Sequence, residues 1–196
     1  MREVELKAVL DSWDDRRARL LRAGATLVFA GRLEDRRYDT SNHLLTSRDI
    51  VLRLRIYRDA SGSSAELEFK GPTAYERGYK VREEIGSTVL DPDAIAHILS
   101  GLGYIVTRAI DREIEQFELG GAMVRFERYP RMDDLVEVEG EPEALERAIA
   151  ALEIPRAAYN ADRLTDFAMR YEERTGERAA LSDAERTGKA PPVRER

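Results

Sequence analysis

Apolar and charged residues alternate through most of the first 140 residues of the chain. In the opening segment Val4, Leu6 and Ala8 alternate with two carboxylates and a lysine, a period of two that predicts a β-strand with one charged face. The same pattern recurs and predicts about eight strands, at residues 3–8, 32–40, 50–59, 64–71, 78–86, 108–119, 122–129 and 134–140. Because several neighbouring segments are only a few residues apart, we expect hairpins and an antiparallel sheet.

Four other segments repeat apolar residues every three or four positions and predict helices at 12–25, 92–103, 141–155 and 160–176. Ser12, Asp91 and Asn160 are the expected N-caps, and Gly176 is the expected C-terminal stop of the last helix. Strands and helices together predict the α+β class. Residues 177–196 are mostly charged and show no apolar face, so we expect a domain over 1–176 followed by a flexible tail over 177–196.

Composition narrows the classes of function. The chain has 196 residues, of which 36% are charged, and its net charge of -6 argues against a nucleic-acid binder. The absence of cysteine excludes thiolate metal sites, and His43 and His97 lie in a polar loop and a predicted helix where a ligand role is not indicated. No stretch approaches the roughly 20 apolar residues of a membrane span, so we expect a cytoplasmic protein without membrane contact.

The charged strand faces allow two interpretations. A solvated face is the usual one, since an antiparallel sheet often buries one side and wets the other. Acids and bases segregate here, however: Glu137 and Glu139 share one strand, and Arg53 and Arg55 share another. Like charges so placed cost free energy unless a ligand compensates them. Carboxylates suit Mg²⁺ or Mn²⁺ and arginines suit phosphate oxygens, so a metal-bound polyphosphate would account for both sets.

Several motifs of the sequence resemble those of one family. They are Glu3-x-Glu5-x-Lys7, Leu52-Arg53-Leu54-Arg55, Phe69-Lys70-Gly71-Pro72, Arg82-Glu83-Glu84 and Val136-Glu137-Val138-Glu139. In this order the motifs resemble the CYTH family, the triphosphate tunnel metalloenzymes, and within it the class IV adenylyl cyclases. The resemblance implies an eight-stranded antiparallel β-barrel that forms a triphosphate tunnel, with helices packed outside.

The resemblance also implies roles for individual residues. Metal ligands or their supports would be Glu3, Glu5, Glu127, Glu137 and Glu139. Phosphate contacts would come from Lys7, Arg53, Arg55, Lys70, Arg82 and Arg112. The resemblance further implies catalytic roles for Lys7, Lys70 and Glu84.

The sequence departs from the family's pattern at a few positions. Glu127 stands where the family usually has an aspartate, and Glu68 is an additional carboxylate. Arg112 and Ile114 align with a common Lys-x-Arg pair, so one cation is replaced, and Arg108 is an alternative source of the base if the register differs.

Three functions follow from the resemblance and stay open at this point. A class IV adenylyl cyclase would convert ATP to cyclic AMP and pyrophosphate, and a triphosphate hydrolase would act on tripolyphosphate, thiamine triphosphate or a nucleoside triphosphate. A module that binds polyphosphate without turnover is the alternative from another class. The expected partner is a small-molecule triphosphate, ATP or tripolyphosphate-like, with Mg²⁺ or Mn²⁺ as cofactor, no nucleic acid, and a homodimer suggested by the cyclase relatives.

Overall fold

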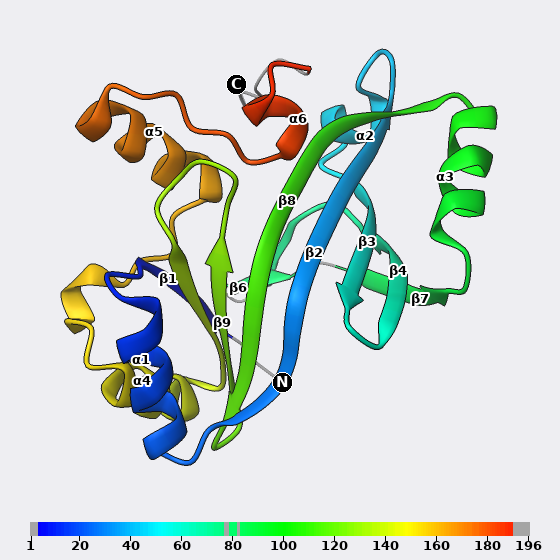
Figure 1. Ribbon diagram of the computed structural model, residues 1–196. Coiled ribbons are helices and arrows are strands. Elements are labelled where there is room, and N and C mark those ends of the chain that lie inside the picture. Colours follow the sequence, from blue (N-terminus) through cyan, green and yellow to red (C-terminus); the bar gives the residue numbers. More distant parts are fainter. Residues whose placement is uncertain (1–3, 77–78, 82, 190–196) are drawn as a thin grey trace. The chain divides into compact units, whose positions relative to one another are not determined.

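The computed structural model of the chain describes residues 4–76, 79–81 and 83–189 (Figure 1). Its strands are β1 (Val4–Val9), β2 (Thr26–Thr40), β3 (Val51–Asp59), β4 (Gly62–Lys70), β5 (Ala74–Glu76), β6 (Tyr79–Val81), β7 (Glu84–Val89), β8 (Tyr104–Leu119), β9 (Ala122–Arg128) and β10 (Leu135–Gly140). Its α-helices are α1 (Trp13–Arg22), α2 (Leu44–Ser47), α3 (Pro92–Gly101), α4 (Pro142–Leu152), α5 (Leu164–Thr175) and α6 (Asp183–Arg186), with a 3-10 turn, η1, at Arg156–Ala158.

Eight of the strands form one antiparallel sheet in the order β1-β10-β9-β8-β2-β3-β4-β7. The α+β class, the eight-stranded sheet and its antiparallel pairing are therefore confirmed. β1 and β7 end this order, and no pairing between them is found in the described part of the chain, so the sheet is not closed into the predicted barrel. The chain divides into two compact units, the first formed by Met1–Gly31 with Arg112–Arg196 and the second by Arg32–Asp111.

The first unit has its core between helices and the apolar faces of its strands. Helices α1 and α4 contact each other, and α4 also contacts β9 and β10 (Figure 1). Trp13 of α1 meets Phe126 of β9 edge-on with ring centroids 5.3 Å apart, and Phe117 of β8 lies 5.5 Å from the same ring. Because strand side chains alternate, burying Val124 and Phe126 turns Arg125 and Glu127 to the opposite face.

The second unit has a smaller core. β3 and β4 form a hairpin across a turn at Ala60 and Ser61, and their inward residues Leu54, Ile56 and Ala65 are buried together with Leu99 of α3. The alternation again turns Arg53 and Arg55 away from this core.

Four predicted helices are confirmed by α1, α3, α4 and α5. Ser12 and Asp91 cap α1 and α3, since each side chain accepts a hydrogen bond from a backbone N–H three residues on, at 3.4 and 2.9 Å respectively. The predicted Asn160 cap is wrong: α5 begins after Arg163, whose backbone N–H donates to Asp166 at 2.9 Å. Asn160 instead pairs its backbone with Lys7, through two hydrogen bonds of 2.8 and 3.0 Å.

Strand boundaries differ from the prediction at several places. The single strand expected over 78–86 is wrong, because β6 pairs with β5 in a separate two-stranded sheet while β7 joins β4 in the main sheet. β2 and β8 begin at Thr26 and Tyr104, earlier than expected. Alternation along a segment does not identify which neighbour that segment will pair with, which explains the divided strand.

The segment after α5 has an apolar contact that the sequence pattern missed. Ala179, Ala180 and Leu181 are buried, and Ala180 exchanges two backbone hydrogen bonds with Arg131, of 2.8 and 3.1 Å. The expectation that 177–196 has no apolar face is thus wrong for these residues, because three small or apolar side chains suffice once the backbone is paired. Flexibility of the tail and the boundary at 176 stay predictions, and residues 190–196 lie outside the described ranges.

Candidate functional site

One group of charged and polar side chains lies on β1, β8, β9 and β10 of the first unit and on the residue directly after β9, and we call it the first charged cluster. Its members are Glu5, Lys7, Arg112, Gln116, Arg125, Glu127, Tyr129 and Glu137. The antiparallel register places Lys7 opposite Glu137 and Glu137 opposite Arg125, so that opposite charges are cross-strand neighbours. Such pairs stabilise a sheet, whereas like charges in these positions would weaken it.

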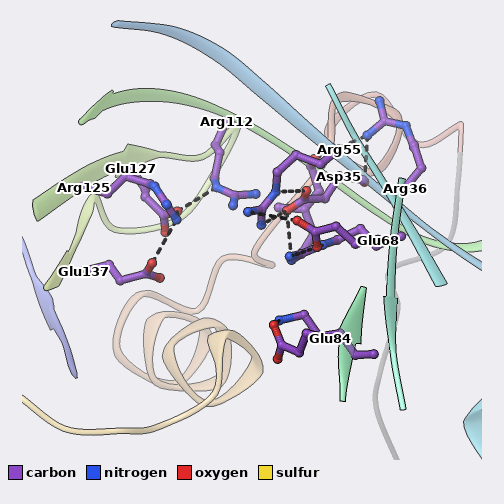
Figure 2. Close-up of polar contacts among 12 residues, drawn as sticks. Asp35, Arg36, Arg55, Glu68, Glu84, Arg112, Arg125, Glu127 and Glu137 are labelled. Carbon is purple, nitrogen blue, oxygen red and sulfur yellow. Dashed lines mark hydrogen bonds and ion pairs between the residues drawn. The ribbon is translucent and has the colours of Figure 1, made fainter. Parts of the chain in front are cut away.

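Glu137 is held between two cations. Its Oε1 lies 2.9 Å from Arg125 Nη1 (Figure 2), and its Oε2 lies 3.1 Å from Lys7 Nζ. Burial alone would raise the pKa of Glu137, but the charges of Arg125 and Lys7 outweigh it and hold this pKa below its ordinary value of 4.5. Lys7 is also paired with Glu5, so the first predicted strand contributes both residues to this cluster.

Glu127 is the most deeply buried carboxylate of the cluster, with 2% of its surface exposed. Arg112 Nε donates to its Oε1 at 2.8 Å, and the Tyr129 hydroxyl donates to its Oε2 at 2.5 Å. Burial and the adjacent Glu127 raise the pKa of Tyr129 well above its ordinary value, so the phenol stays protonated and remains a donor. Both oxygens of Glu127 are therefore occupied by protein donors.

A second group of charges lies in the second unit, and we call it the second charged cluster: Asp35 of β2, Arg53 and Arg55 of β3, and Glu68 of β4. Arg55 binds Asp35 through two N–H groups, at 2.8 and 3.3 Å (Figure 2), and Arg53 binds Glu68 through its Nε at 2.7 Å. Weaker contacts of 3.9 Å cross the pairs, from Arg53 to Asp35 and from Arg55 to Glu68. The side chains of Arg53 and Arg55 are only 15% and 12% exposed, which fixes their guanidinium planes.

Lys70 and Glu84 form a separate pair. They lie opposite each other in the register of β4 and β7, and Lys70 Nζ is 2.8 Å from Glu84 Oε2. The Glu84 side chain is 56% exposed, so this pair is more accessible to water than either cluster. Water can therefore exchange with this pair more readily than with the buried pairs.

The predicted site residues thus fall into distinct places. Lys7, Glu5, Arg112, Glu127 and Glu137 meet in the first cluster, Arg53 and Arg55 meet in the second, and Lys70 meets Glu84. Glu139 is the cross-strand neighbour of Glu5. Glu3 and Arg82 lie outside the described residues, so their roles stay predictions.

The departures from the family's pattern have clear positions in the structure. In the register of β8 and β9, Ile114 lies opposite Glu127 and Gln116 lies opposite Arg125. Ile114 therefore stands beside residues of the first charged cluster, and its side chain is buried. Arg112 contributes its guanidinium to Glu127, while Arg108 lies buried in the second unit. Glu68, the additional carboxylate, is the partner that fixes Arg53.

Sequence reasoning assigned no site role to Asp35, Gln116, Arg125 and Tyr129. Asp35 and Arg125 share the alternation of residues that were assigned, so periodicity held a signal for both. Tyr129 shares that alternation within the predicted strand 122–129, although it lies beyond the last residue of β9. Gln116 gave no signal because it is neutral. Asp39, on the same face of β2 as Asp35, serves the loop instead: its carboxylate accepts from the backbone N–H groups of Thr40, Leu45 and Thr46 at 2.7–2.9 Å.

The chemistry of the acidic residues fits a hard divalent cation. Glu5 and Glu139 are direct cross-strand neighbours, and Glu137 lies two residues from Glu139 on the same strand, which supplies oxygen donors of the kind that Mg²⁺ and Mn²⁺ prefer. In their present conformations, no three acidic side chains of the described residues converge into a metal-binding group. The ion pairs explain this, since Glu127 and Glu137 are turned to protein cations.

Fold and clusters together define a class: an α+β protein whose antiparallel strands carry cations and hard carboxylate oxygens, the inventory suited to metal-bound polyphosphates. The chain belongs to the CYTH family, since the family model for the CYTH domain matches residues 1–174. CYTH triphosphate tunnel metalloenzymes use divalent metals. Among the described residues, no helix has the length and apolar character to cross a membrane.

Solved structures support the same fold. A candidate adenylate cyclase from Vibrio parahaemolyticus is 20% identical, with 84% of this chain and 96% of that chain covered and a TM-score of 0.67. The PH1819 protein from Pyrococcus horikoshii OT3 is 21% identical, with coverage of 86% and 99% and a TM-score of 0.66. HpAC1 from Hippeastrum, a candidate adenylyl cyclase described as revealing a dominant triphosphatase activity, is 15% identical, with coverage of 92% and 99% and a TM-score of 0.59. No curated protein sequence matches the chain.

Proposed function

We propose that this protein is a divalent-metal-dependent enzyme that acts on a triphosphate, and that its reaction is the class IV adenylyl cyclase reaction, ATP to cyclic AMP and pyrophosphate. Membership of the CYTH family supports a triphosphate substrate. Mg²⁺ or Mn²⁺ would be held by Glu5, Glu137 and Glu139, and when bound it would supply positive charge that polarises the attacked phosphorus.

The observation that carries the proposal is the paired arginines of the second charged cluster. Asp35 and Glu68 hold the guanidinium groups of Arg53 and Arg55 in fixed orientations in a largely water-excluded place. Fixed guanidinium groups bind phosphate oxygens in a fork geometry and need little reorganisation during reaction. Arg53 and Arg55 would thus neutralise the charge that builds up on the departing pyrophosphate.

In the cyclase reaction the 3′-oxygen of the ribose forms a bond to the α-phosphorus, the bond from that phosphorus to the pyrophosphate oxygen breaks, and the hydroxyl proton goes to a base or to water. Lys70 would contact the phosphate chain and Glu84 would hold its ammonium group in place, as their 2.8 Å pair supports. Lys7, fixed by its backbone pairing with Asn160 and by Glu137, would contribute a further cation.

A triphosphate hydrolase is the second candidate. It is favoured by the triphosphatase activity named for HpAC1 and by the replacement of one expected cation by Ile114, which would alter how many phosphates are bound. Water would attack the terminal phosphorus, and the same arginines would stabilise the transition state. A module that binds polyphosphate without turnover stays the alternative outside the enzymes.

Product identification separates these functions. The purified protein is incubated with Mg²⁺ or Mn²⁺ and ATP, then with tripolyphosphate, and the products are identified by chromatography. Cyclic AMP with pyrophosphate is the expected result, release of inorganic phosphate would identify the hydrolase, and binding without either product would identify the module. EDTA should abolish turnover in both enzymatic cases.

Matched arginine variants test the role of the second cluster. Arg53→Gln should lower kcat/KM by about 100-fold or more, because one charge-stabilising donor is lost. Arg58→Gln, on the same strand but 44% exposed and paired with Glu34 at 3.6 Å, should stay within about twofold of the wild type because such surface pairs contribute little. Adding Glu68→Gln to Arg53→Gln removes the carboxylate that has lost its main partner, so activity that returns in the double variant would show that misfolding, rather than the lost donor, had caused the defect.

A further inference from the structure

Arg125 of β9 is a cation that lies between Glu137 and Glu127, two carboxylates for which the family resemblance implies a metal role. Its Nη1 is 2.9 Å from Glu137 Oε1 and 4.0 Å from Glu127 Oε1 (Figure 2). A divalent ion that used both carboxylates would have to take this position or share it.

The Arg125 side chain is fixed from both sides. Gln116 of β8, Arg125 and Glu137 of β10 form one row across three neighbouring strands. Arg125 Nε donates to Gln116 Oε1 at 3.1 Å, and the guanidinium group then meets Glu137. With 11% of its side chain exposed, Arg125 is held as part of the sheet rather than as a surface residue.

Among the described residues, each carboxylate of the first charged cluster already has a cation beside it. Three carboxylates meet three cations there, namely Glu5, Glu127 and Glu137 with Lys7, Arg112 and Arg125. Both oxygens of Glu137 are within 3.1 Å of a cation, and those of Glu127 accept from Arg112 and Tyr129. An entering divalent ion would therefore have to compete for oxygens that protein donors already occupy.

We propose that Arg125 is a built-in counter-cation, which holds Glu137 and Glu127 in the position of a divalent metal and so weakens the affinity of the triphosphate-free protein for that metal. This rests on the proposed function, in that the metal is the one the triphosphate reaction would use. Arg125 thereby sets the metal affinity of the site, and Gln116 positions it. Replacing Arg125 removes both the competition for Glu137 and the nearby repulsion of the ion.

The test is a calorimetric titration of the full-length protein with MnCl₂, without any triphosphate. Arg125→Gln should lower the Kd for Mn²⁺ by about tenfold or more, since a unit charge about 4 Å from the ion is removed. The matched control is Arg128→Gln, which removes the same charge from the same strand on its other face, where the side chain is 54% exposed and paired with Asp134. This control should leave the Kd within about twofold of the wild type, since an exposed charge is screened by solvent.

Two outcomes would overturn the inference: Mn²⁺ binding no tighter in Arg125→Gln than in the wild type, or equal tightening in both variants, which would reflect net charge alone. If Arg125→Gln does not fold, as judged by circular dichroism, Gln116→Met takes its place. Gln116→Met leaves every ion pair of Arg125 intact but removes the acceptor of its Nε. The Kd for Mn²⁺ should then fall by about threefold, because the Arg125 guanidinium group can move away from the ion more easily. An unchanged Kd in Gln116→Met would equally overturn the inference.

Failure of this inference is distinguishable from failure of the proposed function. The titration contains no triphosphate and measures no product. A protein without turnover whose Arg125→Gln variant binds Mn²⁺ more tightly would keep the inference and lose the function. Turnover of ATP with an unchanged Kd would do the reverse.

Discussion

Two buried tyrosines of the first unit give a direct test of the hydrogen bonds around Glu127. Tyr129 is 6% exposed and its hydroxyl donates to Glu127, whereas Tyr159 is 5% exposed and its hydroxyl has no hydrogen-bond partner among the described residues. Replacing either by phenylalanine removes one oxygen and nothing else. The same chemical change should therefore have different effects at the two positions.

The magnitudes follow from burial and charge. A hydrogen bond to a charged group contributes about 1.5–3 kcal/mol, and Glu127, at 2% exposure, has no access to water that would replace the lost donor. We expect Tyr129→Phe to lower the free energy of unfolding by about 2 kcal/mol, which corresponds to a Tm decrease of about 4–8 °C for a chain of this size. Tyr159→Phe should change the free energy of unfolding by between zero and about 1 kcal/mol in the stabilising direction, because an unpaired buried hydroxyl is lost.

The assay is urea denaturation followed by circular dichroism, with both variants compared at equal m-values. A double-mutant cycle adds the decisive control: in a Glu127→Gln background the cost of Tyr129→Phe should fall to about 1 kcal/mol, since the acceptor is then neutral. An equal loss in Tyr129→Phe and Tyr159→Phe would refute the reasoning. So would an unchanged cost of Tyr129→Phe in the Glu127→Gln background, since the charged acceptor would then contribute nothing.

Two further measurements test parts of the structure away from the clusters. Burial would raise the pKa of Asp39, but hydrogen bonds from Thr46, Leu45 and Thr40 outweigh it and lower this pKa from 3.8 to about 2. The carboxylate therefore stabilises the fold above about pH 3.8 and loses that effect as the pH falls through about 2. Asp39→Asn should lower the free energy of unfolding by about 2 kcal/mol at neutral pH and by progressively less on acidification. A difference in the free energy of unfolding between variant and wild type that does not change between about pH 5 and about pH 2 would contradict this. Leu181→Ala should lower the free energy of unfolding, measured by urea denaturation, by about 2 kcal/mol because Leu181 is buried. A change below about 0.5 kcal/mol would mean that residues 179–181 are not packed in the first unit.

Much of the fold was predictable because the period of a strand is fixed by covalent geometry. Once Val124 and Phe126 are assigned to the core, Arg125 and Glu127 must lie on the other face, and this reasoning located most residues of both clusters. What it could not supply is which strands become neighbours. The division of residues 78–86 between two sheets and the backbone pairing of Asn160 with Lys7 depend on contacts far apart in sequence, which a local pattern does not encode.

The partner of each charge was unpredictable for the same reason. Asp35 matters because its two carboxylate oxygens accept from Arg55, and Tyr129 matters because its hydroxyl donates to Glu127. Both contacts depend on the register of the strands and on the path of the chain beyond a strand end. Glu68 shows the limit most clearly. The sequence marked it as an additional carboxylate, and only the register of β3 and β4 identifies it as the partner of Arg53.

Register also changes what the segregated charges mean. Like charges on one strand were expected to require a ligand, but Arg53 and Arg55 face Glu68 and Asp35 on the flanking strands, and Glu137 faces Lys7 and Arg125. The flanking strands therefore compensate Arg53, Arg55 and Glu137. Glu139 instead lies opposite Glu5, another carboxylate, and opposite Met123, so a ligand at the carboxylates stays a prediction. A triphosphate would have to exchange with ion pairs already formed rather than fill an uncompensated face. Binding should then depend on how easily each pair opens, and the exposed Lys70–Glu84 pair would open before the buried pairs of Arg53 and Arg55.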